Sequence, residues 1–165
     1  MKIMVLSDTH GDTYYTGLAL DLFRKEKYDK LFLLGDLGRE TIELLNPLHD
    51  KILAVKGNCD SDSLEDLARF PFDSAINFDY DFGKVILLTH GHLFHPYTFQ
   101  GPYDIFLQGH THESFLLRDE RGKILGNPGS LGEPRDYNHS YLSIDETGLK
   151  VKDVESGEVV HFLDF

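Results

Sequence analysis

Nine histidines occur in a chain that has only 16 lysine and arginine residues. Histidine is the commonest metal ligand in proteins and a frequent proton carrier. A cluster of histidines therefore predicts a metal site or a site of proton transfer. The clustered residues are His90, His92, His95, His110 and His112.

Polar side chains also follow five short apolar runs. We interpret these runs as strands, because buried parallel strands appear in a sequence as continuous apolar stretches. In an open α/β sheet, ligands bind in the crevice outside the carboxyl ends of the strands. We therefore expect the polar side chains to meet along one rim. The runs are residues 3–6, 31–34, 52–55, 85–88 and 105–107, and they are followed by Asp8, His10, Asp36, Asn58, His90, His110 and His112.

Carboxylate, imidazole and amide oxygen donors suit Mn²⁺, iron or Zn²⁺ better than Ca²⁺. The only cysteine is Cys59, so the chain has no thiolate set for a structural zinc. Seven donors are too many for one tetrahedral ion, and a carboxylate can bridge two ions. Two ions that share Asp36 account for all seven donors. Two metals about 3.5–4 Å apart can clamp the attacking and leaving oxygens of an in-line displacement.

The spacing within the last group of donors gives a further expectation. His110 and His112 are separated by one residue. Side chains alternate with a period of two along an extended segment, so both imidazoles would lie on one side of it.

The elements that must position these residues alternate between strand and helix in the first half. Residues 13–27 have the pattern of an amphipathic helix, and residues 41–48 are expected to form a short helix that ends near Pro47. Later, short apolar runs separated by turn residues predict antiparallel strands. We find no repeat and no linker, so we expect one α/β domain over residues 1–165. The later strands are expected at 114–117, 124–125, 141–144, 149–154 and 159–163.

The composition excludes several classes of protein. The chain is 41% hydrophobic and 27% charged, which is typical of a globular fold, and its net charge is −12. Such an acidic chain repels phosphate backbones, so we expect no binding to long nucleic acids. No apolar stretch reaches the ~18 residues of a membrane helix. A single cysteine fits a reducing compartment, and there is no signal-peptide core, so we expect a cytoplasmic protein without membrane association.

Five sequence blocks stand in order, each after an expected strand. They are Asp8-x-His10, Gly35-Asp36, Gly57-Asn58-Cys59-Asp60, His90-Gly91-His92 and Gly109-His110-Thr111-His112. This series resembles the calcineurin-like metallophosphoesterase superfamily. The later segment Asn127-Pro128-Gly129-Ser130 resembles its small single-domain, YfcE-type branch.

The resemblance implies a metallophosphoesterase-type sandwich of two mixed sheets flanked by helices. It implies one metal ion on Asp8, His10, Asp36 and His112, and another on Asp36, Asn58, His90 and His110. The metal would be Mn²⁺, with Fe, Zn or Ni as alternatives. The implied reaction is hydrolysis of a small phosphodiester by in-line attack of a hydroxide that bridges the two ions. The expected catalytic residues are Asp36, Asn58 and His92.

Cys59 departs from the wider superfamily, in which many members carry a histidine that assists the leaving group. A thiol is a poor proton donor to an alkoxide, and general acid catalysis is worth about 10²–10⁴-fold. We therefore predict a preference for good leaving groups, such as aryl esters, unless His92 or His95 supplies the proton.

Some local alternatives stay open at this stage. Singly, Asp8 or Asp36 could be a helix N-cap, and His92 could orient a loop. Residues 127–130 could form a sharp turn or donate backbone N–H groups to the site. The aromatic residues Phe94, Tyr97, Phe99 and Tyr103 could line a wall for an aryl group or pack under a loop.

The function also has alternatives. A phosphomonoesterase of the same superfamily would need basic side chains, which are scarce near the five blocks. A nuclease is disfavoured by the net charge of −12. A non-catalytic scaffold of the retromer-subunit kind is disfavoured because every ligand position is filled. An exposed strand edge in the C-terminal half could also pair two copies into a homo-oligomer.

Overall fold

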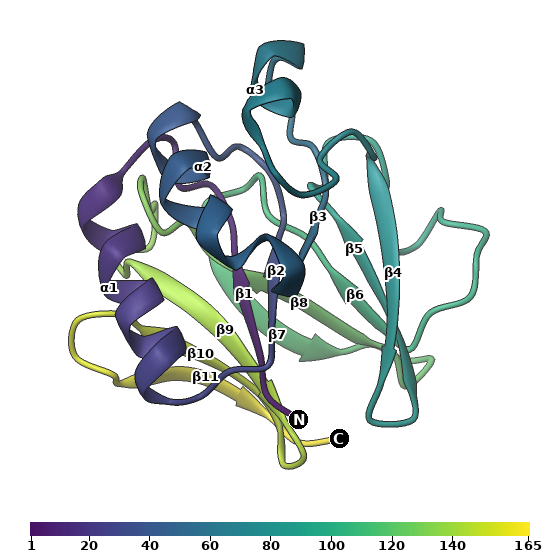
Figure 1. Cartoon of the computed structure of the whole chain (residues 1–165). Helices are drawn as coiled ribbons and strands as arrows, with labels where there is room; N and C mark the ends of the chain where they lie inside the picture. Colours follow the sequence, from purple (N-terminus) through teal and green to yellow (C-terminus); the bar gives the residue numbers. More distant parts are fainter.

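The computed structural model describes all 165 residues, which form two facing β-sheets (Figure 1). The strand order is β11-β10-β9-β1-β2-β3 in the first sheet and β4-β5-β6-β8-β7 in the second. Strands β1, β2 and β3 run parallel, as do β5, β6 and β8, while the flanking strands are antiparallel. The predicted α/β class with two mixed sheets is therefore confirmed.

The bounds of the elements are as follows. The first sheet consists of β1 (Ile3–Leu6), β2 (Lys30–Leu33), β3 (Ile52–Ala54), β9 (Ser140–Asp145), β10 (Gly148–Asp153) and β11 (Val159–Leu163). The second consists of β4 (Ile76–Asp81), β5 (Lys84–Thr89), β6 (Ile105–Leu107), β7 (Ser114–Arg118) and β8 (Ile124–Pro128). The helices are α1 (Thr13–Lys25), α2 (Arg39–Leu45) and α3 (Asp62–Leu67), with a 3₁₀ helix η1 (Asn46–Lys51) after α2.

Helices cover only one of the two sheets. Helices α1 and α2 lie on the outer face of the first sheet (Figure 1), where α1 buries Leu20 and Phe23 against strand residues such as Met4. Helix α1 begins at Asp12, whose side chain accepts a 2.9 Å hydrogen bond from the Tyr15 N–H. A second core fills the space between the sheets and includes Phe32.

A loop covers the outer face of the second sheet in place of a helix. Its Phe99 and Tyr103 pack on Phe106 of β6, with ring centroids 6.3 and 5.3 Å away, and Phe94 joins the same cluster. Tyr97, in contrast, is 59% exposed. Of the two interpretations of this aromatic segment, packing under a loop is therefore correct for all but Tyr97.

The structure contains two elements that the sequence analysis missed and corrects three others. Strand β4 alternates polar and apolar residues along a sheet edge, so it lacks a continuous apolar run, and α3 has only six residues. Helix α1 ends at Lys25 because Lys27 has a left-handed φ of 57°. The helix expected at 41–48 is split between α2 and η1. Strand β8 pairs in parallel with β6, although all the late strands were expected to be antiparallel.

Candidate metal centre

The loops that follow the parallel strands run side by side at one end of the sandwich. After β1 and β2, the Asp8 N–H donates to the Gly35 carbonyl and the His10 N–H donates to the Asp36 carbonyl, both at 3.0 Å. After β5 and β6, the Gly109 N–H donates to the His90 carbonyl at 3.0 Å. These backbone bonds hold the predicted site residues along one rim, as the sequence indicated.

Two groups of ligand atoms form at this rim. In the first group, Asp8 Oδ1 lies 3.2 Å from His112 Nε2 and 3.7 Å from His10 Nε2. In the second, Asp36 Oδ2 lies 3.2 Å from His90 Nε2, and Asp8 Oδ1 lies 4.0 Å from the same nitrogen. The ligand atoms of each group lie within 4.8 Å of one another, so each group could hold one ion.

Asn58 and His110 lie beside the second group. Asn58 Oδ1 is 2.9 Å from His90 Nε2, and the His110 ring is centred 5.0 Å from the His90 ring. The His112 ring, however, is centred 5.0 Å from that of His10 in the first group. The expectation that His110 and His112 share one side of an extended segment is wrong. Both residues have left-handed φ values, 70° and 61°, so the segment turns between them.

Both carboxylates lie between the two groups. Asp8 Oδ1 belongs to both. Asp36 Oδ2 lies 3.8 Å from His10 Nε2, besides its approach to His90. The structure therefore offers two carboxylates that could bridge, and the assignment of Asp36 as the bridging ligand stays a prediction.

Each carboxylate has one oxygen held by the protein and one that faces histidine nitrogens. Asp8 Oδ2 accepts hydrogen bonds from the Ser7 hydroxyl at 2.6 Å and the His110 N–H at 2.9 Å. Asp8 Oδ1 is buried and has no hydrogen-bond partner. Asp36 Oδ1 accepts from the Cys59 N–H at 2.8 Å. A buried carboxylate oxygen without a partner costs free energy, and a cation would satisfy it.

Two histidines are oriented by backbone carbonyls. Nδ1 of His90 donates to the Leu34 carbonyl, and Nδ1 of His112 donates to the Glu133 carbonyl, both at 2.7 Å. With the proton on Nδ1, the neutral ring presents the lone pair of Nε2, which is the atom that faces the carboxylates. Metal-binding histidines usually make such a bond through the other ring nitrogen.

Backbone strain concentrates at the same rim. Five candidate ligands are in the left-handed region that non-glycine residues rarely adopt. Such strain is typical of functional sites, where the surrounding structure enforces it. The five are Asp8 (φ 52°), His10 (46°), Asp36 (53°), His110 (70°) and His112 (61°).

The charges of the site shift the pKa values of its members. Burial opposes ionisation of Asp36, but His90 and the Cys59 N–H outweigh it and lower the pKa of Asp36 to about 2. Burial also disfavours the charged form of His90, yet Asp36 and Asp8 raise its pKa. Asp8 raises the pKa of His10, against burial. The Asp36 carboxylate thus remains ionised at neutral pH, as a metal ligand must be.

The donor set therefore fits divalent ions. It combines carboxylate oxygens, imidazole nitrogens and an amide oxygen, which is the mixture that Mn²⁺, Fe and Zn²⁺ accept. Asp8 Oδ1 has no partner in the protein, and the Nε2 atoms of His10 and His112 lie 3.3 Å apart, so an ion would join donors that lie close together.

Comparison with known proteins identifies the family. Residues 1–148 match the calcineurin-like phosphoesterase superfamily domain. The chain belongs to this superfamily. It is 33% identical to phosphodiesterase YfcE of Escherichia coli K12 over 169 residues, covering 92% of this chain and 91% of that protein.

Solved structures support the same assignment for the fold. The structure of the E. coli phosphoesterase YfcE aligns with a TM-score of 0.92 at 29% identity and covers 99% of both chains. The structure of Entamoeba histolytica Vps29 complexed with Zn²⁺ aligns with a TM-score of 0.72 at 21% identity, covering 99% of both chains. The second likeness is one of fold alone.

His92 and Cys59 border the candidate ligands of the site. His92 is exposed, with its ring centred 5.4 Å from that of His90 and 6.1 Å from that of His110. Partial desolvation and these two histidines lower the pKa of His92. Desolvation and Asp36 raise the pKa of the Cys59 thiol, so it stays protonated at neutral pH. Cys59 serves the site through its backbone N–H.

Several residues that support the site were not predicted. Ser130 Oγ donates to the Asp8 carbonyl at 2.7 Å, and Asn127 Nδ2 donates to the Gly109 carbonyl at 3.0 Å. Segment 127–130 forms a sharp turn at Gly129, which has φ 81° and whose N–H donates to Asn127 Oδ1 at 2.9 Å. The segment also supports the site through the side chains of Asn127 and Ser130. The only sequence signal for segment 127–130 was its position after the other blocks of the family pattern. The carbonyls of Leu34 and Glu133 gave none, since any residue type offers a carbonyl.

Proposed function

We propose that this chain is a cytoplasmic phosphodiesterase that hydrolyses a small phosphodiester with two divalent metal ions, Mn²⁺ being the first choice. The observation that carries the proposal is the pair of carboxylate–histidine groups that share Asp8, with its partnerless Oδ1. The relative YfcE of E. coli is a phosphodiesterase by name and covers nearly the whole chain.

The chain's own residues suggest how the ions and the substrate would be held. Asp8, His10, Asp36 and His112 would hold one ion, and Asp36, Asn58, His90 and His110 the other. When bound, divalent ions lower the pKa of a water nucleophile and stabilise the charge of an in-line displacement. The positive charge of two bound ions would exceed the negative charge of the two aspartates, so the rim would attract a phosphodiester anion although the chain is acidic.

The remaining roles fall to residues that border the groups. Asn58 is exposed beside His90, within reach of a substrate oxygen. His92 is exposed beside His90 and His110, and its ring can donate a hydrogen bond to the departing oxygen. We assign His92 to this position as a proposal, because His110, the other exposed imidazole beside the second group, is already assigned as a metal ligand.

The test is a screen of phosphomonoesters and phosphodiesters with metal-reconstituted protein. We expect Mn²⁺-dependent hydrolysis of bis(4-nitrophenyl) phosphate, and loss of turnover by at least about 10³-fold in Asp36→Ala, because that change removes a carboxylate from both ion positions. Asp66→Ala alters an exposed residue of α3 and should keep full activity. Metal binding, measured by calorimetry, should weaken in Asp36→Ala and stay unchanged in Asp66→Ala.

Other outcomes of this screen would redirect the proposal. Preferential turnover of monoesters would make the chain a phosphomonoesterase, and cleavage of oligonucleotides would make it a nuclease. Metal binding without turnover of any ester would favour a scaffold. A homo-oligomer is compatible with each outcome, and sedimentation would detect it.

A further inference from the structure

A cavity of about 270 Å³ lies beside the candidate metal centre and outside the two ligand groups. Asn58 and His92 belong to its lining, so the cavity begins where the proposed function places the substrate. It is smaller than the roughly 300–1,000 Å³ of pockets for drug-sized ligands. The size fits one small arm of a diester. The other residues of interest in its lining are Lys56, Asp73, Ala75 and Leu93.

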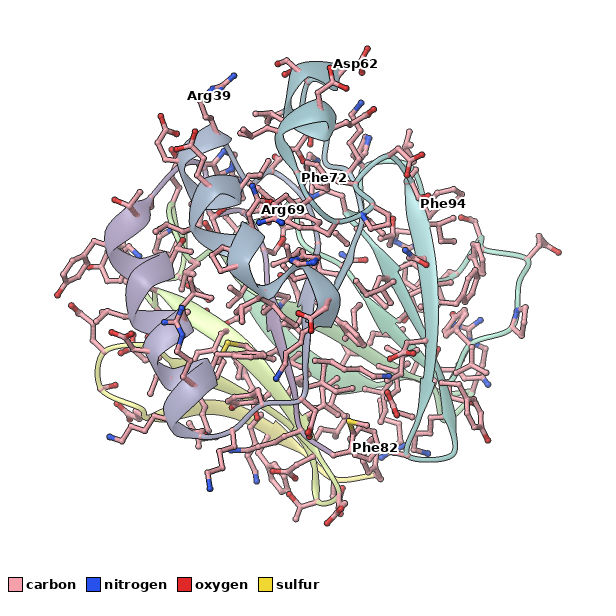
Figure 2. All side chains as sticks on the ribbon, in the orientation of Figure 1. Arg39, Asp62, Arg69, Phe72, Phe82 and Phe94 are labelled. Atoms are coloured by element: carbon pink, nitrogen blue, oxygen red, sulfur yellow. The ribbon has the colours of Figure 1, made fainter.

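The single lysine of the cavity is already neutralised. Lys56 Nζ lies 2.8 Å from Asp62 Oδ1 and also pairs with Glu65. Asp62 stands at the start of α3 and projects into solvent at the upper end of the molecule (Figure 2). Two carboxylates for one ammonium leave this wall with a net negative charge, so a second anionic group on the substrate finds no free cation here.

Asp60 and Asp73 both line the cavity, but only one of them can contact a ligand. Asp60 is buried, and its oxygens accept hydrogen bonds from the N–H groups of Asp36, Gly57 and Leu37. Asp73 is exposed and forms none of the ion pairs or side-chain hydrogen bonds of this face. Asp73 is therefore the one carboxylate of the cavity that is available to a bound group.

We propose that this cavity receives the leaving arm of the phosphodiester and that Asp73 makes it selective for an arm that carries a positively charged ammonium group. The inference rests on the proposed function, which places the departing oxygen near His92. Ala75 and Leu93 supply apolar surface for the body of the arm. An exposed ion pair of this kind is worth about a two- to fivefold change in affinity.

The experiment uses three methyl aryl phosphodiesters whose para substituents are trimethylammonio, tert-butyl and carboxylate. These substituents are of similar size and differ mainly in charge. Hydrolysis releases methyl phosphate and the phenol, and water supplies both the oxygen added to phosphorus and the proton taken up by the phenolate. Comparing variant with wild type for one substrate at a time removes the intrinsic reactivity of each ester.

We expect Asp73→Asn to lower kcat/KM about two- to fivefold for the trimethylammonio ester, mainly through KM. The tert-butyl ester should be unaffected, and the carboxylate ester should improve. Asp73→Lys should reverse the preference between the two charged esters. Asp66→Asn, on α3 but outside the cavity, should change none of the three. Thermal unfolding of each variant shows that its fold is retained.

Two results would overturn the inference, and they are distinguishable. In the first, the ratio of kcat/KM in Asp73→Asn to kcat/KM in the wild type would be the same for all three esters, with normal metal-dependent turnover. Asp73 would then have no role in selectivity, and the proposed function would stand. Absence of metal-dependent turnover in the wild type would overturn the proposed function and the selectivity with it.

Discussion

Asp60 supports the site from beneath while facing away from the candidate ions. Its Oδ2 accepts hydrogen bonds from the N–H groups of Asp36 (2.7 Å) and Gly57 (2.8 Å), and its Oδ1 accepts one from Leu37 (3.0 Å). One carboxylate therefore fixes the loops after β2 and β3 relative to each other.

Asp60→Asn should weaken both the fold and the site, because an amide has one acceptor oxygen where the carboxylate has two. At least one buried N–H would lose its partner, at a cost of about 1–3 kcal/mol. Urea unfolding should show this loss, and calorimetry should show weaker metal binding. Asp66→Asn is the matched control. Unchanged stability and metal affinity in Asp60→Asn would contradict this role.

Cys59 gives a second prediction at the scale of the residue. The Cys59 thiol has a raised pKa and is a poor proton donor to an alkoxide. The lowered pKa of His92 keeps its ring neutral, so it offers the departing oxygen a hydrogen bond and not a full proton. Aryl diesters should therefore be cleaved at least about 10²-fold faster than alkyl diesters. Cys59→His should narrow that difference and Cys59→Ala should not. Steady-state kinetics with one aryl and one alkyl diester decides the question, and equal rates in the wild type would refute the prediction.

At the scale of the element, the strands are short and the loops after them carry the chemistry. Strand β3 has three residues, and the loop after it turns at Gly57 directly against Asp36. A Cβ at Gly57 would collide with the Asp36 backbone nitrogen and Oδ1. The close approach that brings Asn58 toward His90 therefore requires glycine at this position.

Gly57→Ala should displace Asp36, with a cost to folding of about 1–3 kcal/mol and a loss of metal affinity. Gly17→Ala is the matched control, because a methyl group there meets no atom within 4 Å in the middle of α1. The control should stabilise the protein by about 0.5–1 kcal/mol and leave turnover unchanged. Denaturation and metal titration of both variants measure the free energy of unfolding and the metal affinity. Equal changes in Gly57→Ala and Gly17→Ala would disprove the steric argument.

At the scale of the whole molecule, side chains link the two sheets on both sides of the sandwich. Lys30 Nζ lies 2.7 and 2.6 Å from Asp79 and Asp81, which joins β2 to β4. At the other edge, Arg118 of β7 donates to the Asp164 carbonyl at 2.7 Å, beyond the end of β11. No helix is long and apolar enough to cross a membrane. These links help to hold the two sheets together, and with them the two halves of the rim.

Buried tyrosines couple the stability of the whole fold to alkaline pH. Tyr141 is 1% exposed, and burial, with a contribution from Glu26, raises its pKa from 10.0 to about 12. The unfolded chain loses this proton first, so the stabilisation is complete below pH 10 and is lost as pH rises toward about 12. At about 1.4 kcal/mol per pKa unit, the loss is about 2–3 kcal/mol.

Urea unfolding at pH 8, 10 and 11 should show this decline, and Tyr141→Phe should make it shallower. Tyr80→Phe alters a tyrosine that is 67% exposed and should leave the slope as in the wild type. If the unfolding free energy of Tyr141→Phe falls with pH as steeply as that of the wild type, the phenol of Tyr141 does not contribute.

Local patterns in the sequence specify the donor residues of the site and their order along the chain. The donor types, the apolar runs before them and the glycines beside them are local properties, so the rim and the α/β class followed from them. The sandwich of two mixed sheets followed from the resemblance to the family. Local patterns could not reveal β4, because an edge strand with alternating polarity buries too little apolar surface to produce a continuous run.

Local spacing could not show how the donors divide into two groups, and before the structure only the resemblance to the family implied a division. The alternation of side chains along an extended strand predicted that His110 and His112 lie on the same side. Left-handed φ values at both residues place them in different groups. The supports of the ligands, such as Asp60 and the Leu34 carbonyl, act across long separations in the chain. Their geometry arises from packing loops of two sheets against one another. No pattern within a single segment contains that information, because the contacts exist only once both sheets have formed.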